Sequence, residues 1–95
     1  MKLVRLMLAS VLALAFSASS VSAQEASIRK NLTERLPNLP KIDEISKTPM
    51  NGLFEIRMGN DVMYSDAEGN FLIQGALIDV KQKRNITEER IEKLS

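Results

Sequence analysis

The sequence predicts a small α+β domain in which one helix packs on an antiparallel sheet. Three observations predict this class. Apolar residues recur at a four-residue spacing over 26–36, apolar and polar residues alternate over 53–58, and the polar residues 67–70 separate two strand-forming runs. A helical period followed by a two-residue period indicates a helix that covers one face of a sheet.

The first 23 residues are predicted to be an export signal. Lys2 and Arg5 form a basic start, the apolar run after them is too short to span a bilayer comfortably, and Val21-Ser22-Ala23 fits a small-x-small cleavage site. We expect cleavage after Ala23. The alternative is a membrane anchor, which is disfavoured because the run is short and ends in serines and alanines.

The rest of the chain is nearly neutral and has no cysteine. Without Lys2 and Arg5, 11 of the 13 Lys and Arg remain against 12 Asp and Glu, so the net charge is −1. This balance gives no reason to expect a nucleic-acid or membrane-surface partner. Small exported domains are usually disulfide-bonded, and a domain of about 70 residues is only marginally stable alone. We therefore expect self-association to supply part of the stability.

The side-chain inventory excludes most catalytic chemistry. With no Cys and no His, the chain lacks a thiolate, the usual general base and the usual soft metal ligands. Asp61, Asp66 and Glu68 lie close together in the sequence, and a metal or acid–base role for them is the alternative to a solvated polar hairpin. We favour the hairpin and predict no catalytic residue, no metal site and no cofactor.

The helix is predicted over Ala26–Leu36. Ile28, Leu32 and Leu36 form one apolar stripe, and Pro37 ends the helix because the residue before a proline disfavours the helical conformation.

The first strands are expected between residues 40 and 58. Residues 40–49 are predicted to be extended, and Asn51-Gly52 is typical of a type I′ turn. Leu53–Met58 alternates as a half-buried strand does, with its apolar face formed by Phe54, Ile56 and Met58.

The later strands are expected between residues 62 and 80. A turn or bulge at 58–61 leads to a short strand at 62–65 and a hairpin tip at 67–70. A last strand over 71–80 is expected to be interrupted at Gly75, because glycine weakens a regular strand.

A second helix is expected after the charged connector 81–85. Thr87 is the predicted N-cap, Glu88 and Glu89 lie in the first turn, and Ile86 with Ile91 would form a hydrophobic staple. A helix of about two turns is not stable alone in water. We interpret it as the start of a linker.

Together these residues resemble the N-terminal dimerisation domain of the periplasmic disulfide isomerases DsbC and DsbG. The resemblance covers the leading helix, the entry to the strand at Asn51-Gly52-Leu53 and the helix start at Thr87-Glu88. It is most specific over Val62-Met63-Tyr64-Ser65-Asp66, through Gly69, to Ile73-Gln74-Gly75 and Asp79-Val80.

The resemblance implies a cystatin-like fold, a periplasmic location and a homodimer formed by edge-strand pairing, with misfolded secreted proteins as clients. It divides the chain into a signal peptide (1–23), a dimerisation domain (24–82) and the start of an interdomain linker helix (83–95). In that family a thioredoxin-fold domain carries the Cys-x-x-Cys site. We expect this chain to be truncated before that domain and, alone, not to be an enzyme.

The implied site residues lie on the strand around Met58–Tyr64, taken as an edge, on its neighbour and on the linker. The expected dimer-interface residues are Met58, Gly59, Asn60, Asp61, Val62, Met63, Tyr64, Phe71 and Ile73. The expected linker residues are Asn85, Thr87, Glu88 and Ile91. The alternative function is a stand-alone exported cystatin-like or PepSY-like binding domain, such as a protease inhibitor.

Overall fold

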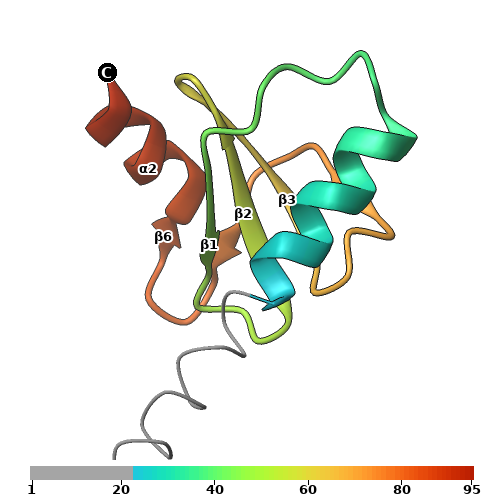
Figure 1. Ribbon diagram of the computed structural model, residues 1–95. Helices are drawn as coiled ribbons and strands as arrows, with labels where there is room; N and C mark the ends of the chain where they lie inside the picture. The colour runs from blue at the N-terminus through green and yellow to red at the C-terminus, as the bar shows by residue number, and fades with distance from the viewer. Residues whose placement is uncertain (1–22) are drawn as a thin grey trace, which may run out of the picture.

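The computed structural model describes residues 23–95, which form an antiparallel sheet with a helix against each face (Figure 1). The expected signal peptide, 1–23, lies outside the described residues except for Ala23. Between residues 23 and 95, no helix is long and apolar enough to cross a membrane.

The N-terminal helix spans residues 23–35, so it begins three residues before the predicted start and ends one residue before the predicted end. The Leu36 N–H still donates to the Leu32 carbonyl at 2.9 Å, and Pro37 then prevents another turn. Ile28 and Leu32 are buried, whereas Leu36 is 42 % exposed and lies at the edge of the apolar stripe.

The main sheet has four strands in sequence order, with β2 and β3 in its interior. Ile56 at the centre of β2 is paired with Ile45 on one side and Met63 on the other. Residues facing the N-terminal helix therefore line up across the sheet, because side chains alternate between its faces. The strands are β1 (Glu44–Lys47), β2 (Leu53–Met58), β3 (Asp61–Asp66) and β4 (Leu72–Ile73).

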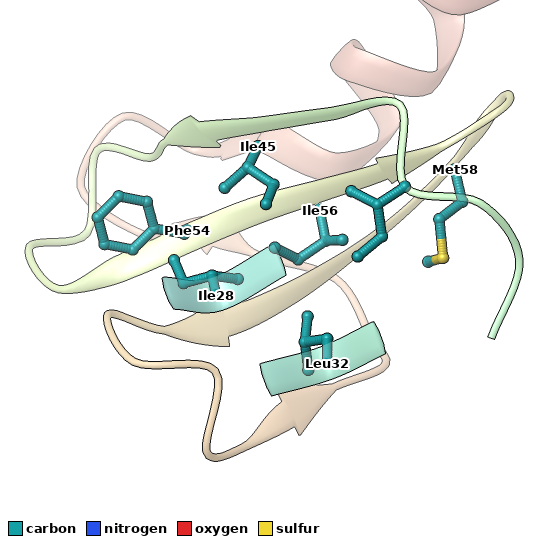
Figure 2. Close-up of a cluster of buried hydrophobic side chains, with 7 residues drawn as sticks. Ile28, Leu32, Ile45, Phe54, Ile56 and Met58 are labelled. Carbon is teal, nitrogen blue, oxygen red and sulfur yellow. The ribbon is translucent and has the colours of Figure 1, made fainter. Parts of the chain in front are cut away.

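The hydrophobic core lies between the N-terminal helix and one face of the sheet, as Figure 2 shows. The predicted alternation of β2 is confirmed, since Phe54, Ile56 and Met58 all point into this core. Ile28 and Ile56 are completely buried. The cluster of buried apolar side chains consists of Ile28, Leu32, Ile42, Ile45, Phe54, Ile56 and Met58.

The turn between β1 and β2 differs from the predicted type I′ geometry. A type I′ turn needs positive φ at both Asn51 and Gly52. Gly52 has φ of 81°, but Asn51 does not have a positive φ, since Lys83 is the one non-glycine residue of the described chain that does. The Leu53 N–H donates to the Met50 carbonyl at 3.1 Å, which together with Gly52 defines a type II turn. Residues 48–53 connect the last paired residues, so the connection is too long to require the two-residue hairpin geometry.

The predicted last strand, 71–80, is wrong as a single element. β4 stays on the main sheet, whereas β5 (Ile78–Asp79) pairs with β6 (Arg84–Asn85) in a separate two-stranded sheet. Gly75 lies between them, at the interruption that the sequence predicts. The expected connector 81–85 thus ends in a strand, since its last two residues pair with β5.

The second helix, α2 (Ile86–Leu94), is capped by Asn85 and not by Thr87. The Asn85 Oδ1 accepts a hydrogen bond from the Glu88 N–H at 3.0 Å. With Asn85 as the cap, the residue before the cap is Arg84 and the fourth helical residue is Glu89, the two positions that a hydrophobic staple would occupy. These two residues form a 2.5 Å ion pair in place of the expected contact between isoleucines. The pairing lowers the pKa of Glu89 and raises that of Arg84.

The hairpin tip 67–70 docks on the N-terminal helix. The Asn31 Nδ2 donates to the Glu68 carbonyl at 2.6 Å, and Gly69 is buried beneath it with φ of 71°. A Cβ at Gly69 would lie 3.0 Å from the Ile28 carbonyl oxygen. This close approach requires glycine for both its backbone conformation and its lack of a side chain.

We expect Gly69→Ala to lower the free energy of unfolding by about 2–3 kcal/mol, the sum of left-handed strain and overpacking against backbone. Gly59→Ala is the matched control, because Gly59 has φ of 63° but open space around its Cβ position. It should cost only the strain, about 1 kcal/mol. Denaturant unfolding measures both, and equal losses would show that the contact with the helix is unimportant.

Candidate functional site

The open edge that β3 offers is shorter than the sequence predicts, and β1 ends the sheet on its other side. Met58 lies on β2, between β1 and β3, and its side chain is buried in the core. The expectation that the strand from Met58 onward forms an edge is therefore wrong for β2. On β3, β4 pairs only with Tyr64 and Ser65, so 61–63 is the stretch of β3 with no strand on its outer side within residues 23–95.

The remaining predicted interface residues occupy three environments. Gly59, Asn60 and Asp61 are exposed at the β2–β3 hairpin, where the Gly59 N–H donates to the Asp43 carboxylate at 2.7 Å. Phe71 and Ile73 are 72 % and 50 % exposed beside the same edge. The buried or half-buried members lie on β3 and are Val62, Met63 and Tyr64.

Tyr64 anchors α2 to the second face of the sheet. Its hydroxyl forms a buried 2.5 Å hydrogen bond with the Thr87 Oγ1, and that oxygen also accepts from the Leu77 N–H at 2.8 Å. The Ile86 N–H donates to the Leu77 carbonyl at 2.9 Å. Thr87 thus joins β3, the segment before β5 and the first turn of α2.

An ion-pair network continues this attachment one turn later. Glu55 is 8 % exposed, and its Oε2 accepts from the Arg90 Nε at 3.1 Å and the Ser46 hydroxyl at 3.2 Å. Arg90 also pairs with Glu44, which in turn contacts the Arg57 Nε at 3.3 Å. The network stabilises α2 on the sheet because Arg90 neutralises a carboxylate that would otherwise be buried without a charged partner.

Local sequence gives no signal for this network. Glu55 lies on the polar face of an alternating strand, which by itself indicates exposure to solvent, and Arg90 is 35 residues away. Of the expected linker residues, Thr87 is buried, Asn85 and Ile91 are half-buried, and Glu88 is exposed. The first turns of α2 are therefore packed against the sheet.

An apolar groove of about 600 Å³ lies beside the free edge. It runs between the end of the N-terminal helix, the segment after it and the strands β3 and β4. Met63 and Leu72 are half-buried on the sheet side, and Leu36 is partly exposed on the helix side. Its apolar lining is formed by Leu36, Pro37, Leu39, Pro40, Met63 and Leu72.

The three carboxylates, Asp61, Asp66 and Glu68, each accept local hydrogen bonds, and those of Asp61 and Asp66 come from backbone amides. The Asp66 Oδ1 accepts from the N–H groups of Asn70 (2.8 Å) and Phe71 (3.0 Å). Desolvation opposes ionisation, but these amides and their neighbours outweigh it and hold the pKa of Asp66 below its usual value. Asp61 accepts from the Val62 N–H at 3.0 Å, and Glu68 from the Asn70 side chain at 3.2 Å. Among residues 23–95, no group of three or more potential ligands could hold a metal ion.

The fold and the site define a small α+β module with an apolar groove, a short open sheet edge and no thiol or imidazole anywhere in its sequence. Residues 19–88, more than half of the chain, match the family described as "Disulfide bond isomerase protein N-terminal domain". The chain belongs to this family.

Two curated relatives of the chain are considerably longer than it is. It is 40 % identical over 68 residues to the "Probable thiol:disulfide interchange protein DsbC" of Bordetella avium (strain 197N), which covers 72 % of this chain and 24 % of the relative. It is 33 % identical over 79 residues to the protein of the same description from Bordetella pertussis (strain Tohama I), covering 83 % of this chain and 28 % of the relative. The chain spans about a quarter of the length of these curated relatives.

We expect Arg90→Ala to lower the free energy of unfolding by about 1–3 kcal/mol, less than for a fully buried pair because Arg90 is 29 % exposed. Glu55→Ala in the same background should recover part of the loss, since it removes the unpaired carboxylate. Arg84→Ala breaks the exposed ion pair between β6 and Glu89 of the same helix and is the control that should change stability least. A double-mutant cycle by thermal unfolding measures the coupling, and additive losses for Arg90 and Glu55 would contradict the network.

Proposed function

We propose that the chain is the dimerisation and client-holding module of a periplasmic thiol:disulfide interchange protein. The observation that carries the proposal is the family match over residues 19–88 together with the absence of any cysteine. Without a thiolate the chain cannot itself exchange disulfides. Its contribution is then to bring two copies together and to present apolar surface.

The sheet edge supports self-association. A strand without a neighbour presents backbone groups that a second strand can pair with. Residues 61–63 form such a stretch, in which the Asp61 side chain accepts from the Val62 N–H. The exposed Phe71 and Ile73 lie beside it and would add apolar contact. Pairing about a twofold axis would make this interface self-complementary.

The remaining parts of the proposal follow the same family membership. The fold is cystatin-like, the signal peptide occupies 1–23, the dimerisation domain 24–82 and the start of the interdomain helix 83–95. The contacts of Thr87 and Arg90 with the sheet fix the orientation of α2, which supports its role as the start of the interdomain helix.

Sedimentation equilibrium of the purified protein tests the dimer. We expect reversible dimerisation in the micromolar range, because the free edge is short and the exposed apolar area beside it is small. Phe71→Ser should weaken the dimer by about tenfold through loss of apolar contact. Val80→Ser is the control, since Val80 is 81 % exposed but lies beyond β5, away from this edge. A monomer at all concentrations up to hundreds of micromolar would refute this part of the proposal.

An aggregation assay tests client holding. The protein should slow light scattering by a reduced, unfolding client, because apolar grooves bind exposed apolar segments. Leu36→Lys at the groove should reduce this suppression severalfold. Met50→Lys, also at an exposed apolar residue but outside the groove, should leave it unchanged. Equal suppression by both variants would rule out the groove as the client site.

A further inference from the structure

The backbone of Val62 faces the open side of the sheet. The Arg57 carbonyl accepts from the Asp43 N–H at 2.8 Å, so the backbone of Arg57 is directed toward the β1 side. Val62 is the residue opposite Arg57, and in an antiparallel ladder such a pair has its peptide groups directed away from each other. β4 does not reach Val62. Val62 therefore presents its N–H and carbonyl to the position that an added strand would occupy.

The Val62 N–H is already engaged. The Asp61 Oδ1 accepts from it at 3.0 Å, and Asp61 itself is exposed. A charged side chain at an edge is a recognised means of preventing strand addition. Here the carboxylate also occupies the donor that an added strand would need.

A twofold pairing of two such edges would bring the carboxylates together. With Val62 opposite Val62 of a second copy, Asp61 of each chain lies diagonally across from the other on the same face, about 7–8 Å apart. This separation is within the Debye length of about 8 Å at physiological ionic strength. Two like charges at this distance oppose the pairing.

We propose that Asp61 limits the affinity of self-association, by capping the outward Val62 N–H and by placing like charges across the twofold axis. The inference rests on the dimer of the proposed function and names the residue that regulates it. The occupant of the edge is a second copy of this chain. Asp61 keeps the association weak and sensitive to ionic strength.

Two substitutions separate the effect of the Asp61 hydrogen bond to the Val62 N–H from the effect of the Asp61 charge. Asp61→Asn keeps an oxygen that can accept from the Val62 N–H but removes the charge, and it should tighten dimerisation about threefold. Asp61→Ala removes both and should tighten it about tenfold or more. Asp79→Ala is the matched control, because the Asp79 Oδ1 caps the Gln82 N–H at 3.0 Å in the hairpin between β5 and β6, away from the edge.

Sedimentation equilibrium at two salt concentrations measures all four proteins, and thermal unfolding checks that each is folded. Raised salt should tighten the dimer of the natural chain and of Asp79→Ala, but change that of Asp61→Ala much less. If the natural chain dimerises and the Asp61 variants associate equally or more weakly, the role of Asp61 is wrong and the dimer stands. If no folded variant associates, the dimer of the proposed function fails, and the inference fails with it.

Discussion

The fold depends on the burial of β2 on both of its faces. The strand alternates with a period of two, so Phe54, Ile56 and Met58 enter the core beneath the N-terminal helix while Glu55 faces the opposite side. It also has a strand partner on each edge, which satisfies its backbone groups. β1, β3 and both helices contact this strand directly.

The two faces of the sheet are covered by different kinds of interaction. The N-terminal helix packs through apolar side chains, whose burial supplies most of the stabilisation in a domain of this size. α2 is held by directional contacts, the hydrogen bond between Tyr64 and Thr87 and the ion pair between Glu55 and Arg90. Directional contacts specify one orientation of a short helix more strictly than apolar packing, because they fail when the helix rotates or slides.

The short length of β4 explains where an interaction surface is available. Within residues 23–95, β1 and β4 end the sheet, and β4 is so short that it leaves the start of β3 uncovered. A domain without disulfides has few other ways to gain stability than to cover such an edge with another chain. The apolar groove beside this edge is formed by Pro37 and Pro40 as well as by the sheet, because Pro37 lies in the turn that follows the helix, where the Leu39 N–H donates to the Leu36 carbonyl at 3.1 Å.

Much of the fold could be predicted from local sequence, because helical and strand periods need no knowledge of distant residues. The helix with Ile28 and Leu32, the strand Leu53–Met58, the turn at Gly69 and the interruption at Gly75 are all of this kind. The membership of the chain in its family could also be inferred from residues that lie close together, chiefly Val62–Gly75.

What failed were the features that depend on residues far apart in the chain. The helix cap moved from Thr87 to Asn85 because the Thr87 hydroxyl binds Tyr64, 23 residues earlier. The strand after Phe71 divided because Ile78–Asp79 found a partner in Arg84–Asn85. The burial of Glu55 became acceptable only when α2 brought Arg90 to it. The sequence by itself determined which elements form, through local periodicity and turn chemistry. Only the tertiary structure decided which polar groups are buried and which edge stays open, because both depend on the partners that folding brings together.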